Sequence, residues 1–489
     1  MEMTLKDILK NIITLKQIGE DNTMVSGIEF DSRKVTNGSL FVAINGVTVD
    51  GHKYIVKAIE FGAKVIVFEE DGVDTSIEGV TFVKVDDTKE ALGLMASNFY
   101  GNPSSKLKLV GVTGTNGKTT IATQLYTLFG LLGYKAGLFS TIKILAGDEE
   151  IVSTNTTPDP VTLNKYLNQM LDAGVTHCFM EVSSHGIDQR RIAGLEFAGG
   201  AFTNITRDHL DYHNTFREYL NVKKRFFDEL PKSAFAISNS DDKNGLVMLQ
   251  NTKAKKLTYS MKSVSDYKVR LIESHFNGML LTIANKEIWT KLIGKFNAYN
   301  LLAIYAVAIE LGEDTDEVLT AISKLESVTG RFDHFLSDTG VITVIDYAHT
   351  PDALKNVLET INDIRTGNEK LITVVGCGGD RDKGKRPEMA KISCELSNKV
   401  VLTSDNPRTE KPEDIIADME AGVPAEYYNK TVSITDREQG IKSACQEANA
   451  GDIILIAGKG HETYQDVMGV KHDFDDFEKA KTILTLLKK

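Results

Sequence analysis

The sequence predicts an α/β protein of three domains, and three observations support this prediction. The chain has 489 residues, and globular domains usually take about 100–200 residues each. Apolar runs of strand length alternate with segments of helical periodicity, which is typical of parallel sheets covered by helices. This alternation starts at a glycine-rich run, 109–120, and starts again near residue 330. We therefore expect an N-terminal domain over 1–105, a central domain over 106–329 and a C-terminal domain over 330–489.

The N-terminal segment mixes short strands with turns. Its apolar runs lie at 27–46, 63–70 and 81–87, and turn-forming residues separate them. Residues 102–105, Asn-Pro-Ser-Ser, are typical of a linker. These features predict a small α/β domain ahead of the glycine-rich run.

The run LVGVTGTNGKTT (109–120) predicts a strand, a glycine-rich loop and the start of a helix. Apolar residues then recur at spacings of three and four, which indicates one buried helix face: Ile121, Leu125, Leu128, Phe129 and Leu132. Backbone N–H groups at a helix N-terminus attract anions, and a lysine and a threonine hydroxyl add a charge and a magnesium ligand. We therefore predict a loop for nucleotide phosphates, formed by Gly114, Thr115, Asn116, Gly117, Lys118, Thr119 and Thr120. The alternative is a plain turn with an exposed lysine, because Val112 replaces the first glycine of the usual pattern.

Further apolar runs in the central segment predict strands at 136–141, 176–184, 197–205 and 233–242. Helical stretches lie between them, so we expect a mostly parallel sheet. The region 251–295 is less regular and indicates additional strands. Helical periodicity returns at 297–311 and 315–326 and predicts two helices.

In the C-terminal segment, four strands each lead directly into a polar motif: 341–350, 371–387, 399–408 and 452–462. Helical segments separate them, for example 351–361 and 438–448, as in a doubly wound, Rossmann-like sheet. Ligands of such sheets bind outside the carboxyl ends of the strands. We therefore expect the four motifs to face one crevice.

The composition excludes several classes of function. The net charge is −12, which argues against a nucleic-acid or membrane-surface binder. The cysteines show no C-x-x-C pair, as expected for reduced thiols: Cys178, Cys377, Cys394 and Cys445. We find no basic and apolar leader and no apolar run of about 18 residues. These features predict a cytoplasmic protein without membrane insertion, and we also expect a monomer.

Carboxylate and imidazole groups follow the phosphate loop at the ends of predicted strands. Glu181 ends one strand, and the run at 202–213 carries Asp208, His209 and Asp211. Near a phosphate loop, such groups suit magnesium ions that bridge nucleotide phosphates. The alternatives are a solvated strand end for Glu181 and a capped loop histidine for His209.

Seven motifs occur in an order similar to that of the Mur ligases, the ATP-dependent amide ligases of bacterial cell-wall precursor synthesis. They are GTNGKTT (114–120), EVSSHG (181–186), TNITRDHLDYH (203–213), Y-x-x-x-K-K-x-F-F (219–227), GKFNAYNLLA (294–303), VTGRF (328–332) and IDYAHTPDAL (345–354). Four more resemble the members that add the third residue of the peptide stem: DSRKVTNGSLF (31–41), NTTPDP (155–160), GCGGDRDKGKRP (376–387) and GKGHE (458–462). The resemblance implies a UDP-binding N-terminal domain, a central P-loop ATPase-like domain and a Rossmann-like C-terminal domain.

The resemblance also implies nucleotide and metal sites. The phosphate loop with Lys118 would bind the ATP phosphates, and the rest of the nucleotide would meet Asn297, Asn300, Arg331 and Asp346. Mg²⁺ would be held by Thr119, Glu181, His209 and Lys223, the lysine as a carbamate (N6-carboxylysine). Lys118, Glu181, His209 and Lys223 would then be the catalytic residues. From the residues alone, Lys223 is an ordinary solvated lysine, and Lys224 beside it leaves the register open.

Two substrate sites follow from the same resemblance. UDP-N-acetylmuramoyl-L-alanyl-D-glutamate would be bound by Ser32, Asn155, Thr156, Thr157, Ser183, Gln189 and Arg191. The incoming amino acid would be bound by Arg381, Asp405, Asn406, Pro407, Arg408, Gly458 and Glu462. An arginine at 408 can bind the distal carboxylate of meso-diaminopimelate, or of its near-isostere meso-lanthionine, through two hydrogen bonds. L-lysine lacks this carboxylate and is the alternative amine.

The implied reaction phosphorylates the γ-carboxylate of D-glutamate with ATP, and an amine then displaces phosphate from the acyl phosphate. Two other hypotheses compete with it. The first is a folylpolyglutamate-synthetase-like ligase, and the N-terminal domain argues against it because those relatives begin near the phosphate loop. The second is a nucleotide-controlled binding or scaffold protein, which would not need four polar motifs at strand ends. Phosphate release that depends on both an amino acid and the UDP-muramoyl dipeptide separates these hypotheses.

Overall fold

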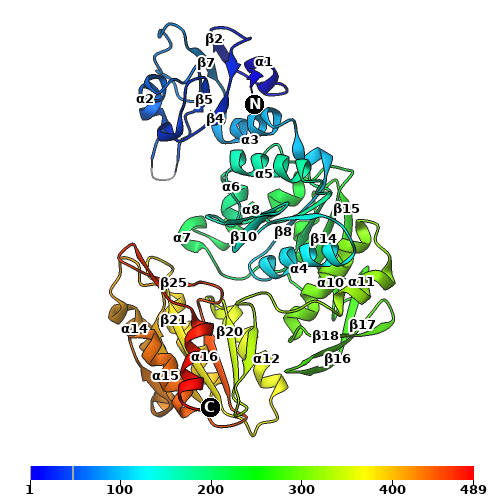
Figure 1. The fold of residues 1–489 in the computed structure, drawn as a ribbon, viewed down its shortest axis with the longest axis vertical. Coiled ribbons are helices and arrows are strands. Elements are labelled where there is room, and N and C mark those ends of the chain that lie inside the picture. The colour runs from blue at the N-terminus through cyan, green and yellow to red at the C-terminus, as the bar shows by residue number, and fades with distance from the viewer. Residues whose placement is uncertain (1, 47–48) are drawn as a thin grey trace.

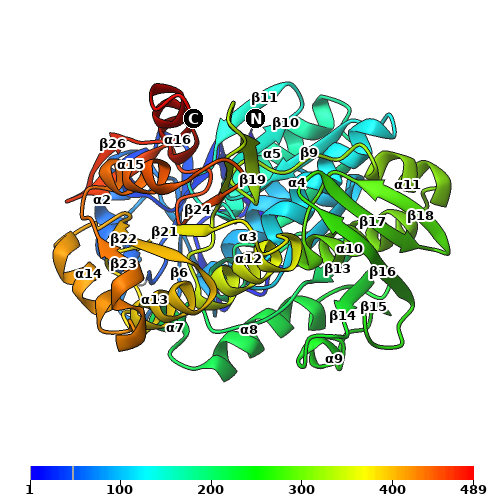
Figure 2. The same ribbon diagram turned by 90° about the horizontal axis from the view of Figure 1, so that it is seen from below.

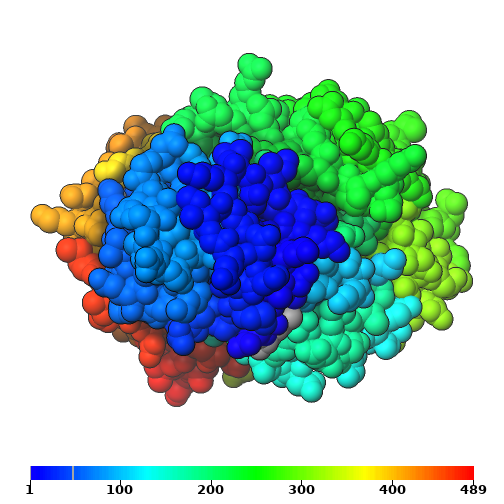
Figure 3. Space-filling view, turned by 90° about the horizontal axis from the view of Figure 1, so that it is seen from above, coloured from blue at the N-terminus to red at the C-terminus, as the bar shows by residue number. Residues whose placement is uncertain are grey.

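In the computed structural model, which describes residues 2–46 and 49–489, the three large sheets follow one another along the longest axis of the molecule (Figure 1). The N-terminal sheet lies at one end, the central sheet in the middle and the C-terminal sheet at the other end. Viewed from the N-terminal end, the central domain extends beyond the N-terminal domain that lies in front of it (Figure 3). The α/β fold with three domains is therefore confirmed.

The N-terminal sheet has the order β2-β7-β6-β5-β4, and only β2 is antiparallel to its neighbour. One face packs on α1 and α3, and the other packs on α2. The elements are β1 (Met3–Thr4), α1 (Leu5–Ile8), β2 (Lys16–Ile18), β3 (Met24–Val25), β4 (Gly27–Glu29), β5 (Ser39–Val42), α2 (Ile55–Glu60), β6 (Val65–Phe68), β7 (Thr81–Lys84) and α3 (Thr88–Phe99).

The central sheet has the order β11-β10-β9-β12-β8-β13-β14-β15-β16-β17-β18. The strands from β9 to β16 are parallel, as predicted, and antiparallel hairpins extend both edges. The strands are β8 (Lys108–Thr113), β9 (Ala136–Phe139), β10 (Lys143–Ala146), β11 (Glu149–Val152), β12 (His177–Glu181), β13 (Gly199–Phe202), β14 (Phe235–Asn239), β15 (Lys255–Ser260), β16 (Tyr267–His275), β17 (Gly278–Ile283) and β18 (Lys286–Thr290).

Helices cover both faces of the central sheet. One face packs on α4 (Lys118–Leu131), α10 (Lys295–Glu310) and α11 (Thr315–Ile322). The other face packs on α5 (Pro160–Asp172), α6 (Ser184–Asp188), α8 (Phe216–Asp228) and α9 (Gly245–Met248), and the short α7 (Leu210–His213) precedes α8. The parallel strands are apolar because both of their faces are buried.

The C-terminal sheet has the order β19-β20-β24-β21-β22-β23, with only β19 antiparallel. Helices α12, α13 and α14 cover one face and α15 and α16 the other (Figure 2). The elements are β19 (Asp333–Leu336), β20 (Ile342–Asp346), α12 (Pro351–Ile364), β21 (Leu371–Cys377), α13 (Lys385–Leu396), β22 (Lys399–Ser404), α14 (Pro412–Glu420), β23 (Thr431–Ser433), α15 (Arg437–Glu447), β24 (Ile453–Ala457), β25 (Tyr464–Val467), β26 (Val470–Asp473) and α16 (Asp476–Leu486).

A buried ion pair joins α15 to α16 beneath the carboxyl ends of β22 and β24. Arg437 donates to both oxygens of Asp476 (2.8 and 2.7 Å) and to the carbonyl of Ala457 (3.2 Å), and neither charged side chain is exposed. We expect Arg437→Met to lower the free energy of unfolding by about 3–5 kcal/mol, because the carboxylate stays buried without its partner.

The matched control is Glu438→Gln, which removes the half-exposed Lys479–Glu438 pair (2.6 Å) between the same two helices. That change should cost at most about 1 kcal/mol. Thermal unfolding followed by circular dichroism compares the two variants. Equal shifts would contradict the role assigned to the buried pair.

Within the described ranges, no helix is both long and apolar enough to cross a membrane.

Candidate functional site

The phosphate loop joins β8 to α4 and is held against the end of β13. The Asn204 carbonyl accepts the backbone N–H of Thr115 (2.8 Å), and its side-chain oxygen accepts that of Asn116 (3.0 Å). Gly114 has a φ of 150°, and a Cβ there would overlap Thr203 Oγ1. The loop conformation therefore requires glycine at this position and depends on the two residues after β13.

The first turn of α4 carries the polar residues of the loop. Lys118 Nζ donates to the carbonyl oxygens of Gly114 (2.9 Å) and Thr115 (2.8 Å), and burial lowers the pKa of this ammonium. Thr119 and Thr120 follow it and are both buried. The strand, glycine loop and helix start that the sequence predicts at 109–120 are confirmed.

Thr119 lies where three elements meet. Its hydroxyl donates to Glu181 at the end of β12 (2.9 Å) and accepts a hydrogen bond from Arg331 (3.0 Å). Glu181 is completely buried, so it is not a solvated strand end. Its other oxygen accepts the backbone N–H of Thr141 (2.6 Å). The structure therefore brings the loop, a buried carboxylate and the C-terminal domain into direct contact.

Helix α8 places Lys223 at the same loop. Its Nζ donates to the carbonyl of Gly114 (2.8 Å) and lies 4.8 Å from the centre of the Tyr219 ring. Burial, together with the nearby Lys118 ammonium, holds the pKa of Lys223 well below its usual value. Lys224 instead pairs with Asp228 (2.6 Å) one turn further along the helix. Of the two lysines, Lys223 is the one beside the phosphate loop.

His209 precedes α7 in a left-handed conformation, with a φ of 53°. Its Nε2 lies 3.4 Å from an Asp208 oxygen, and its ring is 6.1 Å from that of Tyr219. Burial lowers the pKa of His209, and the imidazole is therefore neutral at pH 7. Neutral imidazole is the form that ligates metals.

The residues predicted to contact the rest of the nucleotide surround the phosphate loop. On α10, Asn300 packs against Gly117 and donates to the side-chain oxygen of Asn297 (3.0 Å). Asp346 ends β20 and accepts the backbone N–H of Phe332 (2.6 Å). Burial raises the pKa of Asp346 to about 6.

A pocket of about 620 Å³ lies between the N-terminal and central domains. Four of the residues predicted to bind the UDP-muramoyl dipeptide line it: Ser32, Asn155, Gln189 and Arg191. The same pocket is lined by Phe30, Tyr54, Lys57 and Lys89, which the sequence reasoning missed. Phe30 adjoins the DSRK motif, but the others stand outside any recognised motif and gave no signal.

The other three predicted residues of that set lie elsewhere. Thr156 lines a second pocket. Thr157 is completely buried, and its hydroxyl donates to the carbonyl of Glu181 (2.8 Å). Ser183 caps α6 by accepting the backbone N–H of Gly186 (3.0 Å). Thr157 and Ser183 therefore fix the backbone beside Glu181.

The second pocket, of about 300 Å³, is formed by the four C-terminal motifs together with central-domain residues. Because β24 lies between β20 and β21, the segments that follow these strands are neighbours. Of the predicted amino-acid-binding set, the pocket is lined by Arg381, Asp405, Asn406, Arg408, Gly458 and Glu462. His209 lines it from the opposite side, with Asp208 and Asp211.

Arg408 has a left-handed backbone, with a φ of 51°, which is strained for a residue with a Cβ. Its guanidinium donates to the carbonyl of Gly379 (2.8 Å), and its N–H donates to the carbonyl of Asp466 (3.0 Å). Pro407 does not line the pocket, and its carbonyl accepts the N–H of Glu410 (3.0 Å) in the turn. The arginine is therefore held over the pocket by two neighbouring loops.

Sequence reasoning also missed polar residues of the second pocket: Arg207, His349 and Lys385. Arg207 lies within the 203–213 motif, His349 within the 345–354 motif and Lys385 within the 376–387 motif, so the place in the motif was the available signal. Arg207 bridges the domains, because it lies 3.3 Å from Asp382 and 3.4 Å from Glu388.

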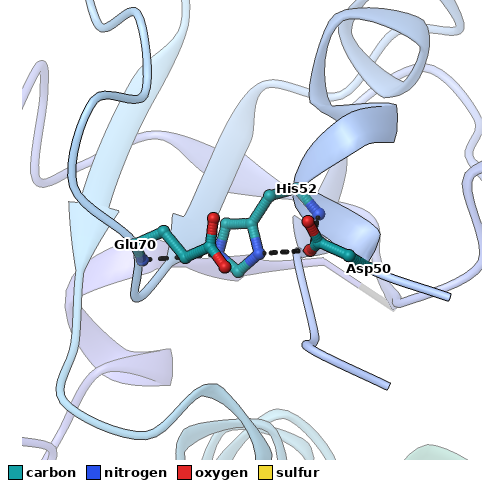
Figure 4. A group of neighbouring side chains, drawn as sticks. All are labelled: Asp50, His52 and Glu70. Atoms are coloured by element: carbon teal, nitrogen blue, oxygen red, sulfur yellow. Dashed lines mark hydrogen bonds and ion pairs between the residues drawn. The ribbon is translucent and has the colours of Figure 1, made fainter. Parts of the chain in front are cut away.

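Asp50, His52 and Glu70 form a further cluster whose ligand atoms are close enough for a metal (Figure 4). His52 Nδ1 lies 2.8 Å from Asp50, and Nε2 accepts the backbone N–H of Glu69 (3.2 Å). Both ring nitrogens are thus occupied by the protein, and the cluster serves to fasten the loop after β6.

Three family profiles match consecutive parts of the chain. Their descriptions are Mur ligase family, catalytic domain (24–100), Mur ligase middle domain (112–308) and Mur ligase, glutamate ligase domain (330–460). A Bacteroides fragilis protein named UDP-N-acetylmuramoyl-L-alanyl-D-glutamate--2,6-diaminopimelate ligase is 55% identical over 484 residues, 99% of this chain and 100% of that protein. The chain belongs to the Mur ligase family. The predicted family resemblance is confirmed.

Other Mur ligases agree with this assignment. A Clostridioides difficile protein of the same name is 42% identical and covers 99% of this chain and 100% of its own length. A solved structure of a ligase with that name superposes with a TM-score of 0.71 at 31% identity over 100% of both chains. A folylpolyglutamate synthase from Thermotoga maritima shares the fold alone, with a TM-score of 0.58 at 13% identity, and covers 76% of this chain and 90% of its own.

Proposed function

We propose that this Mur ligase joins meso-diaminopimelate, or meso-lanthionine, to UDP-N-acetylmuramoyl-L-alanyl-D-glutamate at the expense of ATP. The observation that carries the proposal is the second pocket, in which Arg408 and Glu462 face His209 beside the phosphate loop. An amine held by the C-terminal motifs would lie next to the carboxylate that ATP activates. The names of relatives at 55% and 42% identity support the same substrates.

The donors around the phosphate loop fit Mg²⁺. Thr119 and Glu181 offer hard oxygen ligands 2.9 Å apart, and His209 offers a neutral imidazole. Lys223 would complete the set as a carbamate, because a buried amine of low pKa reacts readily with CO₂. When bound, Mg²⁺ neutralises phosphate charge. The domain boundaries at 105 and 329 are part of this proposal.

The residues of the chain would act mainly by positioning and by balancing charge. Lys118 and the loop N–H groups would hold the phosphates while a γ-carboxylate oxygen of D-glutamate takes the γ-phosphoryl group and ADP leaves. The amine nitrogen then attacks the acyl carbon, phosphate departs, and the nitrogen loses a proton. Arg191 and Gln189 would hold the muramoyl dipeptide at the other end. ATP and UDP-linked sugars are cytoplasmic metabolites, so we place the reaction there, and we expect a monomer.

We expect the wild-type enzyme to use meso-diaminopimelate and to use L-lysine poorly. Arg408 would bind the distal carboxylate, and the loss of that contact should cost about 2–4 kcal/mol, or roughly 30- to 1000-fold in specificity. Arg408→Ala should bring the kcat/KM values of the two amines closer together, mainly by lowering kcat/KM for meso-diaminopimelate. The measurement is kcat/KM for each amine, from phosphate release that requires the UDP-muramoyl dipeptide.

Lys411→Ala is the matched control, because it removes an exposed cation three residues along the same segment, outside the pocket. Lys411→Ala should leave the preference for meso-diaminopimelate over L-lysine unchanged. Equal use of L-lysine by the wild type would contradict the distal-carboxylate argument and would favour the alternative amine.

A further inference from the structure

A buried lysine stands beside the carboxylates of the second pocket. Lys459 follows β24, and its side chain is completely buried. Its Nζ lies 3.3 Å from Glu462 Oε2, 3.3 Å from Asn406 Oδ1 and 3.9 Å from Asp405 Oδ1, and it also donates to the carbonyl of Tyr464. Sequence reasoning did not single out this lysine.

The charges of Lys459, Asp405 and Glu462 do not balance. Asp405 and Glu462 carry two negative charges when ionised, and Lys459 carries one positive charge. Asp405 Oδ1 is buried and has no hydrogen-bond partner among the described residues. A buried carboxylate oxygen without a partner is costly. One negative charge of this group therefore remains to be balanced by a cationic ligand.

We propose that Lys459 is a positioning residue of the amino-acid pocket, which neutralises one of two adjacent carboxylates and so leaves a single negative charge for the ammonium of the incoming diamino acid. This inference rests on the proposed function. Arg408 takes the distal carboxylate of the same head group, so the bound zwitterion and the pocket are electrically matched. The ligand class is an amino acid with a second α-amino-acid head.

Lys459 also fixes the orientation of Asn406. The lysine ammonium and the backbone N–H of Asp466 (2.9 Å) both donate to Asn406 Oδ1. The amide nitrogen must then face the other way, and it donates to Glu462 Oε2 (2.7 Å). A reversed amide would place an oxygen against the carboxylate. The lysine therefore holds Glu462 in one position through direct and indirect contacts.

The protonation of Glu462 depends on the same neighbours. Burial and Asp405 raise the pKa of Glu462, and the Lys459 ammonium and the Asn406 amide oppose that rise. The other titratable or charged groups near it are Tyr347, His461, Tyr464, Arg437, Arg381 and Arg408. Without Lys459, Glu462 should remain protonated to higher pH and would then no longer attract an ammonium.

The test is the pH profile of kcat/KM for meso-diaminopimelate in Lys459→Met. The acidic limb should move to higher pH by about 1–3 units, the usual effect of removing an opposite charge at this distance. KM for the amine should rise more than KM for ATP. In a Glu462→Gln background, Lys459→Met should cost much less, because its main partner is gone.

Lys471→Met is the matched control. This exposed ammonium on β26 lies over the ring of Tyr464 on β25 (3.9 Å) but does not line the pocket. It should leave the acidic limb in place. Calorimetric binding of the UDP-muramoyl dipeptide reports correct folding. If Lys459→Met does not bind the UDP-muramoyl dipeptide, two other variants replace it. Lys459→Gln must then move the acidic limb of the pH profile to higher pH, and Lys459→Arg must leave it in place.

The outcomes separate the two proposals. A wild-type enzyme that forms no product from ATP, the UDP-muramoyl dipeptide and meso-diaminopimelate would overturn the proposed function. An active wild type whose acidic limb is unchanged in a folded Lys459→Met or Lys459→Gln variant would overturn the role of Lys459 and leave the function standing.

Discussion

Replacing Lys118 by alanine is expected to lower kcat/KM by about 10³-fold or more while the protein stays folded. The ammonium lies inside the phosphate loop, where it donates to the carbonyls of Gly114 and Thr115. Removing a preorganised positive charge from a phosphoryl-transfer site typically costs this much. Alanine is also the best helix former, so the first turn of α4 should persist. Phosphate release with both substrates present gives the rate, and circular dichroism checks the fold.

Lys108→Ala is the control for this prediction. Lys108 starts β8, the strand that leads into the loop, and its side chain is exposed. Its removal deletes a positive charge from the same strand without touching the loop, so activity should stay close to that of the wild type. If Lys118→Ala kept near-normal turnover, the ATP-ligase proposal would fail.

Much of the fold could be predicted because burial imposes a period on the sequence. Ile121, Leu125, Leu128 and Phe129 recur with helical spacing, and all four are completely buried on one face of α4. Parallel strands place their carboxyl ends at one edge of a sheet. For that reason, four motifs spread over 341–462 could be predicted to face one crevice, and the structure brings them into one pocket.

The antiparallel elements were harder to predict. The hairpin β10–β11 and the hairpin β25–β26 lie at or beyond sheet edges, and many of their side chains are exposed. Short exposed strands carry little hydrophobic pattern. Their existence depends on pairing with a neighbour rather than on their own composition.

Contacts between domains were beyond the reach of sequence patterns. Arg331 reaches Thr119 across 212 positions, and Asn116 donates to Asp352 (3.1 Å) across 236 positions. These contacts depend on how rigid domains are oriented, and no local periodicity encodes that orientation. The buried charge of Lys459 was missed for a related reason, since two of its partners, Asp405 and Asn406, follow a different strand, β22.

The choice between two adjacent lysines shows what the structure adds at the level of single residues. Lys223 stands four positions after Tyr219 and three before Phe226, which are both buried, so helical geometry turns it toward the core. Lys224 is turned about 100° away, toward Asp228. The pattern was present in the sequence, but two consecutive lysines looked like a surface run.

We expect Lys223→Ala to be nearly inactive and to be partly rescued by short-chain carboxylates. The amine lies 2.8 Å from the Gly114 carbonyl, and its low pKa favours the neutral form that adds CO₂ to give a carbamate. Alanine removes this acidic ligand, and a small carboxylate can enter the space and supply part of the lost charge. The measurement is phosphate release at increasing concentrations of formate or acetate. A carbon-13 resonance of wild-type protein equilibrated with labelled bicarbonate reports the carbamate directly.

Lys224→Ala decides whether the effect belongs to Lys223. This variant breaks an i, i+4 pair with Asp228 (2.6 Å) and leaves the phosphate loop untouched. This pair lies away from the phosphate loop, so activity should change little and carboxylates should have no effect. Because both variants remove one positive charge from the same turn of α8, a general electrostatic cause would affect them alike. A defect and rescue at Lys224 with normal activity at Lys223→Ala would contradict the assignment, since only a side chain beside Gly114 can serve the phosphate site.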